Sequence, residues 1–215
     1  MYIPPLFREG DRAAMNAMIH EARLSILVSN GADGLPEISY LPLLLDEADG
    51  ATGSLLGHLA RANPHWKSLA QTGKATVIFK GADAYVSPAW YPTKQVHHRH
   101  VPTWNYEAVH AMCRVEVFDD PARLRDVVTR LTNRFEAGRA EPWTIDQAPA
   151  DYITAMLRAI VGLKLSIEEL QGKRKLSQNR EPVDRQGVRD ALAASSDPGD
   201  QGVLRSMRAL HDKER

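Results

Sequence analysis

The sequence has few cysteines, since Cys113 is the single one in 215 residues. One thiol cannot form an intramolecular disulfide, which excludes a disulfide-stapled extracellular domain and favours a reducing compartment. Cys113 lies in the apolar run AVHAMCRVEVF, where no neighbouring feature would activate a thiol. We therefore interpret it as a small buried side chain and not as a catalytic nucleophile.

An excess of charge of one sign is also missing. Lysine and arginine number 27, aspartate and glutamate also number 27, and the formal net charge is zero. A dedicated DNA-binding module usually carries a clear positive excess that neutralises phosphates. DNA is thus a partner that the composition supports only weakly.

Long apolar runs and several catalytic motifs are absent from the sequence. No uncharged apolar stretch approaches the roughly 20 residues of a membrane-spanning helix. The opening segment MYIPPLFREGDR carries prolines and charges and has no apolar region typical of a signal peptide, so a cytoplasmic protein is expected. There is no P-loop, no GxGxxG and no serine–histidine–acid spacing, and no catalytic residue is assigned.

Short apolar or alternating runs separated by turns predict most of the fold. About six strands with short turns up to residue 118 fit a small β-barrel better than a parallel sheet with crossovers. Helices are expected where Asp11, Asn63 and Asp120 provide caps. The predicted strands cover residues 24–30, 37–46, 53–60, 76–81, 84–91, 108–118 and 161–173, and the predicted helices 11–22, 63–74, 121–138 and 151–160.

The domain organisation expected from these patterns is one main domain and a tail. Residues 1–180 form the barrel domain, with a helical insertion near residues 120–160. Residues 181–215 are polar, with two weakly helical patches around a PGDQG interruption, and loose packing or partial disorder is expected there.

The window GHLARANPHW brings groups suited to an anion into one short segment. His58 ends a predicted strand, Arg61 lies in the turn, and Asn63 precedes a helix whose first N–H groups are free to bind. A guanidinium beside a helix start can hold a phosphate. On these residues alone, an ordinary capped helix beside a surface arginine is the better interpretation.

Two aromatic windows follow, AYVSPAWYPT and VPTWNY. They contain Ser87 and Trp90 in the first, and Trp104 and Asn105 in the second. Aromatic clusters are more often core or interface than cofactor wall. Prolines in both windows remove backbone donors, which indicates stiff loops rather than plain core strands.

Two further polar segments have both an ordinary and a functional interpretation. GKRKLSQNR supplies Lys175, Ser177 and Gln178 after the last strand, either as a solvated basic turn or as a cationic arm that reaches a phosphate. KQVHHRH holds three histidines, but no acid or cysteine nearby completes a metal site, so an exposed loop without metal is expected.

Taken in order, the strings LLGHLARANPHW, AYVSPAWYPTK, VPTWNY, APADYITAMLRAIVG and KLSQNR resemble the PaiB-like family of FMN-binding negative transcriptional regulators. The resemblance runs from Met1 to about Asp190. It implies an α+β fold, a split β-barrel like that of pyridoxamine phosphate oxidases with flanking helices, and a homodimer with FMN at the subunit interface. Carried over by position, the implied cofactor-binding residues are His58, Arg61, Asn63, Ser87, Trp90, Trp104, Asn105, Lys175, Ser177 and Gln178.

Three functions are compatible with this sequence. The first is a regulator that senses flavin, redox state or a small ligand. The second is a flavin-dependent oxidoreductase or flavin reductase, since a flavin with an open face needs no protein acid or base. The third, suggested only by the histidines, is a split barrel that handles haem or a metal.

Overall fold

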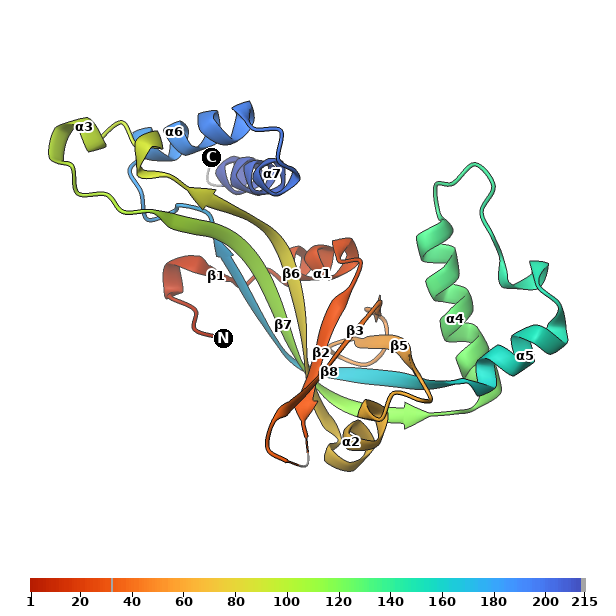
Figure 1. The fold of residues 1–215 in the computed structure, drawn as a ribbon. Helices are drawn as coiled ribbons and strands as arrows, with labels where there is room; N and C mark the ends of the chain where they lie inside the picture. Colours follow the sequence, from red (N-terminus) through yellow and green to blue (C-terminus); the bar gives the residue numbers. More distant parts are fainter. Residues whose placement is uncertain (32, 214–215) are drawn as a thin grey trace. The chain divides into compact units, whose positions relative to one another are not determined.

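The structure is a computed structural model that describes residues 1–31 and 33–213, and its strands form one eight-stranded antiparallel sheet. The strand order is β3-β2-β6-β7-β8-β5-β4, and β1 pairs with β8 (Figure 1). The strands are β1 (Arg8–Glu9), β2 (Ser25–Asn30), β3 (Pro36–Leu41), β4 (Leu44–Asp46), β5 (Ser54–Ala60), β6 (Lys74–Val86), β7 (Thr103–Phe118) and β8 (Ile160–Lys175).

The helical elements of the described residues follow the chain order of Figure 1. The α-helices are α1 (Arg12–Glu21), α2 (His65–Thr72), α3 (Lys94–His97), α4 (Pro121–Glu136), α5 (Ala150–Arg158), α6 (Pro182–Ala194) and α7 (Pro198–Lys213). Three 3-10 turns, η1 (Pro5–Phe7), η2 (Pro88–Trp90) and η3 (Ile145–Gln147), complete the list. None of these helices is both long and apolar enough to cross a bilayer.

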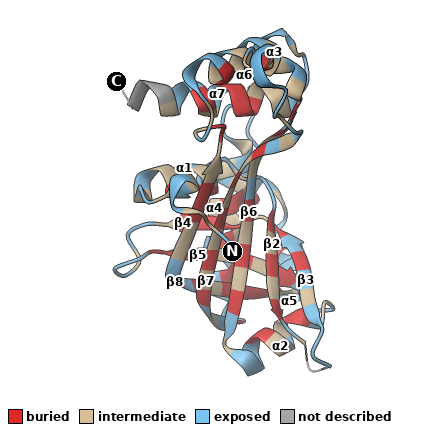
Figure 2. Cartoon of the chain, turned by 90° about the vertical axis from the view of Figure 1, so that its left-hand side faces the viewer, coloured by how far each residue is buried: buried red, intermediate tan, exposed pale blue. Residues whose placement is uncertain are grey.

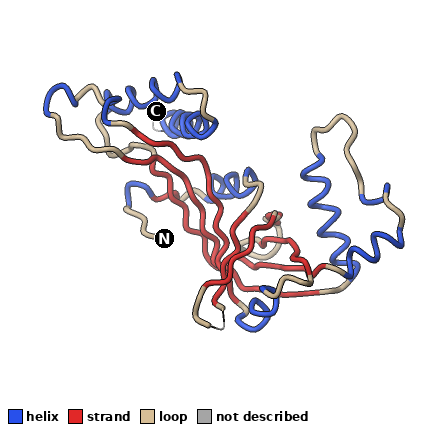
Figure 3. The backbone as a smooth tube through the Cα atoms, in the orientation of Figure 1, coloured by secondary structure: helices blue, strands red, loops and turns tan. Residues whose placement is uncertain are grey.

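The chain divides into two compact units. Unit 1 comprises residues 1–15, 80–109 and 171–215, and unit 2 comprises residues 16–79 and 110–170. The long strands β6, β7 and β8 are neighbours in the sheet and contribute residues to both units (Figure 3). Each unit is described below by itself.

Unit 2 is built around a core between its strands and the helices α4 and α5. The amphipathic pattern of α4 explains this packing, because Leu124, Val127 and Leu131 on its apolar face are buried. The Asp120 carboxylate caps α4 by accepting from the Arg123 N–H at 2.8 Å, and Gly138 at φ +85° follows its end. The buried cluster is Leu44, Phe118, Leu124, Val127, Leu131, Ile145, Ile153 and Leu157.

Unit 1 has its own core, to which the last two helices contribute. Buried and less buried residues alternate along the strands, and buried residues of α7 face inward (Figure 2). Helices α6 and α7 are amphipathic, but the polar residues on their outer faces make this part of the sequence look polar overall. The buried cluster is Ala84, Val86, Tyr91, Leu176, Val188, Leu192, Val203, Leu204 and Met207.

Several expectations need correction. The two strands expected on either side of Gly81 are one continuous strand, β6, and the segment after Val86 is the turn η2 rather than strand. Strand β7 begins at Thr103, not near Ala108, so VPTWNY belongs mostly to the sheet. The expectation of a loosely packed tail is wrong, because α6 and α7 bury five apolar side chains in the core of unit 1.

Candidate functional site

The start of β7 and the residues after β8 meet at a buried polar contact in unit 1. Asn105 is fully buried, its Nδ2 donates to Ser177 Oγ at 2.9 Å, and Ser177 Oγ lies 3.2 Å from Asn105 Oδ1. Ser177 has φ +66°, a left-handed conformation that is uncommon for residues other than glycine. A strained backbone of this kind persists only where the surrounding contacts hold it, and such positions cluster at functional sites. We call Thr103, Trp104, Asn105, Lys175, Ser177 and Gln178 the β7–β8 corner.

Lys175 provides the cation of the β7–β8 corner. Its Nζ donates to Thr103 Oγ1 at 2.7 Å and to the carbonyl oxygen of Trp104. Burial lowers the pKa of Lys175, and the positive charges of Arg180 and Lys173 lower it further. A bound anion would relieve this electrostatic cost, so the site favours a negatively charged ligand.

Trp104 provides a flat apolar surface at the same corner. Its side chain is 53% exposed, and its ring meets that of Tyr85 edge to face at a centroid distance of 5.9 Å. Tyr85 is itself 44% exposed. An exposed, geometrically ordered aromatic pair is an available wall for a planar ligand.

Gln178 fixes the turn that follows β8. Its Oε1 accepts from the Leu176 N–H at 2.6 Å, and its Nε2 donates to the Arg174 carbonyl at 2.6 Å. Both ends of the amide are therefore used within the turn. Gln178 positions Lys175 and Ser177, and this local role accounts for its place in the KLSQNR string.

Ser87 and Trp90 lie at the η2 turn of the same unit. Ser87 Oγ accepts from the Ala89 N–H at 3.2 Å, which is a cap and not a ligand contact. Trp90 packs against the unit 1 core. A Cβ added at Gly187 of α6 would lie 2.1 Å from the Trp90 carbonyl oxygen, so glycine is needed for this helix to approach the turn.

The three remaining predicted contacts belong to unit 2. His58 lies in β5 opposite Gly162, its Nδ1 is buried without a hydrogen-bond partner among the described residues, and burial lowers its pKa. Asn63 Oδ1 accepts from the His65 N–H at 3.0 Å, and Asn63 Nδ2 donates to Ser39 Oγ at 3.1 Å. The N-cap residue of α2 is Pro64 and not the predicted Asn63, whose amide is satisfied by these two local contacts.

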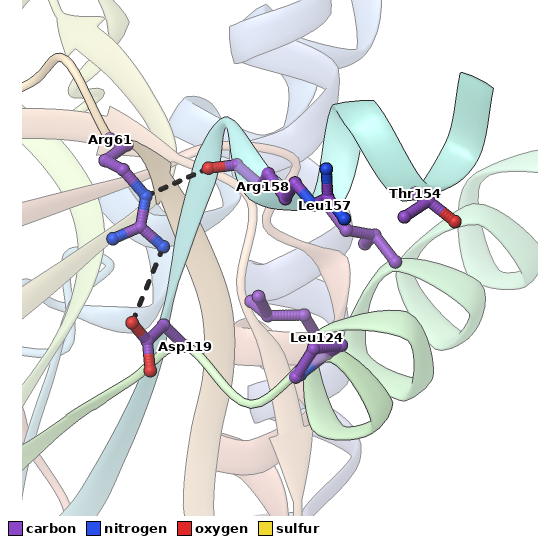
Figure 4. Close-up of a pocket in the computed structure, with 7 residues that line it drawn as sticks. Arg61, Asp119, Leu124, Thr154, Leu157 and Arg158 are labelled. Carbon is purple, nitrogen blue, oxygen red and sulfur yellow. Dashed lines mark hydrogen bonds and ion pairs between the residues drawn. The ribbon is translucent and has the colours of Figure 1, made fainter. Parts of the chain in front are cut away.

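Arg61 is held by main-chain oxygens. Its Nε donates to the Arg158 carbonyl at 2.9 Å, and Asp119 Oδ2 lies 3.8 Å from its Nη2 (Figure 4). The Nη2 group also donates to the Ile160 carbonyl at 3.1 Å. If Arg61 binds the phosphate as predicted, it must do so with the guanidinium N–H groups that do not already donate to these carbonyls.

A cavity of about 420 Å³ lies beside Arg61 in unit 2. The sequence patterns did not predict it, because Arg61, which follows β5, is distant in the chain from Asp119 and from the lining residues of α4 and α5. Figure 4 shows these side chains around the cavity. The lining residues are Arg61, Asp119, Pro121, Leu124, Thr154, Leu157 and Arg158.

The histidine segment differs in part from the expected exposed loop. His97 and His98 are exposed, but the side chain of His100 is 6% exposed and its Nε2 lies 2.8 Å from Thr93 Oγ1. Thr93 in turn donates to the buried carboxylate of Asp184 at 2.7 Å. Across the residues that the structure describes, no group of three or more potential ligands could hold a metal ion.

The reactivity of Cys113 is low, as its sequence context predicts. The side chain is buried in β7, and burial raises the pKa of the Cys113 thiol to about 12, with the Glu168 charge contributing. A thiol with such a pKa is protonated at neutral pH and is a poor nucleophile.

Comparison with solved structures gives the class of protein. A conserved hypothetical protein from Mycobacterium tuberculosis superposes with a TM-score of 0.59 at 13% identity, covering 85% of this chain and 94% of that chain. The FAD and heme binding protein from Mycobacterium smegmatis gives a TM-score of 0.56 at 18% identity, covering 78% and 73%. The fold of this chain is an α+β split β-barrel with flanking helices, as predicted.

Sequence comparison gives the family. Residues 1–169 match the family described as "Putative FMN-binding domain". "Protease synthase and sporulation protein PAI 2" of Bacillus subtilis is 30% identical over 198 residues, 92% of each chain. An uncharacterized protein of Aspergillus fumigatus is 30% identical and covers 99% of this chain and 98% of its own. This chain belongs to the PaiB-like FMN-binding family, and its cofactor is FMN.

The β7–β8 corner fits the chemical needs of FMN. The isoalloxazine ring needs a flat wall, which the exposed face of Trp104 offers, and the phosphate needs a cation, which Lys175 offers. The buried Asn105–Ser177 hydrogen bonds join the start of β7 to the turn after β8 and so support the corner. Which of the ten predicted residues touch the cofactor stays a prediction.

Proposed function

We propose that this chain is an FMN-dependent regulatory protein whose flavin lies at the β7–β8 corner. The observation that carries this proposal is the exposed Trp104 ring, ordered against Tyr85, together with the half-buried Lys175 ammonium, which donates to the main-chain carbonyl of Trp104. Trp104 would cover the ring system, and Lys175 would pair with the phosphate or the pyrimidine edge. Bound FMN supplies reversible electron transfer, which makes the protein's state dependent on redox conditions.

A regulatory role is supported by the relative whose printed name concerns protease synthesis and sporulation in Bacillus subtilis. The balanced charge of this chain gives no electrostatic basis for strong non-specific DNA binding. We therefore propose that the flavin state controls a protein surface or a low-affinity DNA contact, in a cytoplasmic protein, rather than constitutive promoter binding.

We further propose a homodimer with the flavin between the subunits. Trp104 and Tyr85 are both substantially exposed in one chain. A cofactor as wide as FMN is usually buried over most of its surface, so a second wall is needed opposite Trp104. A second copy of this chain would supply that wall.

Flavin titration of point variants tests the site. Trp104→Leu should weaken FMN binding by about 0.5–1.5 kcal/mol through lost ring contact. Lys175→Gln should weaken it by about 1.5–3 kcal/mol through a lost charge-assisted bond. Trp143→Leu, which removes a tryptophan that is 42% exposed in unit 2, is the matched control and should bind FMN normally. Normal affinity in both corner variants would show that the flavin lies elsewhere.

A gel-shift titration with oxidised and reduced holoprotein tests regulation through DNA. The fragment is the promoter region of the protein's own gene, at physiological salt. A shift in only one redox state supports a flavin-controlled contact with DNA. No shift at micromolar protein in either state restricts regulation to a protein partner.

A flavin-dependent oxidoreductase is the second candidate, because a solved structure with this fold is described as a FAD and heme binding protein. Anaerobic mixing of holoprotein with NADH or NADPH distinguishes the two. Rapid bleaching of the flavin absorbance, followed by multiple turnovers with an electron acceptor, would establish catalysis. Absence of bleaching with both nicotinamides would leave the regulatory function.

A further inference from the structure

We propose that the cavity beside Arg61 in unit 2 binds a small aliphatic carboxylate, separately from FMN. The cavity has a volume of about 420 Å³, within the range of roughly 300–1,000 Å³ typical of small-molecule sites. It lies at the edge of the unit 2 core, where Leu124 of α4 and Leu157 of α5 are buried. The inference is independent of the regulatory role and of the β7–β8 corner.

The wall of the cavity selects an aliphatic body. Pro121, Leu124 and Leu157 form its apolar part, and the Thr154 hydroxyl is used within α5 because it donates to the Ala150 carbonyl at 2.8 Å. The lining residues that the structure describes include no aromatic ring. Such a wall suits a flexible hydrocarbon chain and gives no stacking surface to a flavin or a nucleobase.

The charged residues of the cavity lining favour a negatively charged ligand. Two guanidinium groups, Arg61 and Arg158, line the cavity together with one carboxylate, Asp119, which leaves one positive charge in excess. Asp119 is 3.8 Å from Arg61 and its side chain is 73% exposed, so this ion pair is weak and open to exchange. A ligand carboxylate can therefore replace Asp119 at Arg61.

Both arginines retain donors for such a ligand. Arg61 uses Nε and one Nη2 hydrogen for main-chain carbonyls, which leaves both Nη1 hydrogens and one Nη2 hydrogen. Within the described part of the chain, no carboxylate pairs with the Arg158 guanidinium. Because the carbonyl contacts hold Arg61 in place, little side-chain freedom is lost when an anion binds.

Calorimetric titration of FMN-loaded protein with octanoate tests the proposal. Octanoate should bind with one site per chain, and the affinity should rise about fourfold for each methylene added up to decanoate. Octylamine, with the same chain and the opposite charge, should not bind. Absence of octanoate binding, or equal binding of octylamine, would overturn the proposal.

Substitutions of the lining residues distinguish specific binding at the cavity from an effect of the net charge of the protein. Arg158→Gln should weaken octanoate roughly tenfold, and Asp119→Asn should strengthen it several-fold because the competing carboxylate is removed. Thr154→Phe should block the cavity from an exposed helix position. Arg139→Gln, the same charge change on a residue outside the lining, should leave octanoate binding unchanged.

Competition between octanoate and FMN decides whether the two sites are separate. Octanoate should bind flavin-loaded and flavin-free protein equally, and Arg158→Gln should leave FMN affinity unchanged. If FMN displaced octanoate and Arg158→Gln lowered FMN affinity, the cavity would belong to the flavin and the proposal would be wrong. Normal FMN affinity in the Trp104 and Lys175 variants would contradict the proposed flavin site but would not by itself make FMN compete with octanoate.

Discussion

Lys175 illustrates how the surroundings of one residue alter its chemistry. Burial and two neighbouring cations lower the pKa of its ammonium from the ordinary 10.5, and the Thr103 hydroxyl and Trp104 carbonyl are the groups that it contacts. The charge that would attract a flavin phosphate is therefore lost at a lower pH than for a surface lysine.

The first prediction concerns FMN affinity as the pH is raised. We expect the affinity of the native protein to fall as the pH is raised towards 10.5, because Lys175 loses its charge at a lower pH than an ordinary lysine does. Fluorescence titration of FMN at a series of pH values measures the fall. Lys175→Gln should lack this component, and any ionisation of the flavin itself is common to both proteins. A parallel fall in the variant would contradict the assignment.

His65 is a second residue whose role depends on burial. Its Nε2 lies 2.9 Å from Ser29 Oγ and its Nδ1 lies 2.8 Å from Ser39 Oγ, inside unit 2. Burial lowers the pKa of His65, and the opposing effect of the Glu37 charge is smaller. The neutral imidazole links two strands of the β2–β3 hairpin through hydroxyl groups.

The second prediction concerns stability below pH 6.5. The unfolded chain takes up a proton on His65 near the ordinary pKa, whereas the folded chain does so only at lower pH, so the free energy of unfolding falls as the pH drops below 6.5. Urea unfolding at pH 7.5 and pH 5.5 should show a smaller pH dependence in His65→Gln. An unchanged dependence would assign the effect to His58 and His110, whose pKa values burial also lowers.

At the scale of elements, α7 is part of the folded core and not an appendage. Val203, Leu204 and Met207 of α7 lie in one cluster with Val188 and Leu192 of α6. Ser206 also hydrogen-bonds to the buried carboxylate of Glu107 in β7, which ties the helix to a strand of unit 1. The end of the chain therefore supports the strands that carry the β7–β8 corner.

The third prediction concerns Met207. Met207→Ala should lower the free energy of unfolding by about 2–5 kcal/mol, as buried methionine truncations do. Arg208→Ala, at the neighbouring exposed position, should change it by less than about 0.5 kcal/mol. Chemical denaturation of both variants measures the difference. Equal stability of the two would mean that α7 does not contribute to the cooperative core.

At the scale of the whole molecule, the cofactor and the association of chains are coupled in our proposal. A ligand that contacts two subunits binds the dimer better than the monomer and shifts the equilibrium towards the dimer by mass action. The exposed Trp104 and Tyr85 rings are the apolar surface that such an association would cover.

The fourth prediction follows from this coupling. Sedimentation velocity over a dilution series should give a tighter monomer–dimer equilibrium with FMN than without it. Riboflavin, which lacks the phosphate, should have a weaker effect. A monomeric protein that binds one FMN per chain would exclude a shared site while leaving the cofactor itself in place.

Much of the fold could be predicted because alternation and capping are local signals. The strand at residues 24–30 is β2 from Ser25 to Asn30, and the helix capped by Asp120 is α4. The prediction failed where a local signal was weaker than pairing across the sheet. Gly81 indicated a break, but the neighbouring strands hold β6 continuous through it, and VPTWNY joins β7 for the same reason.

The sequence by itself determined the family, the cofactor and most of the strands and helices, because long ordered strings and periodic apolar residues are properties of the chain alone. Only the tertiary structure brought Asn105 against Ser177 and placed Arg61 beside Asp119 and Arg158. These contacts join residues about 60 to 100 positions apart, and no short-range pattern encodes which distant side chains meet once the sheet has formed.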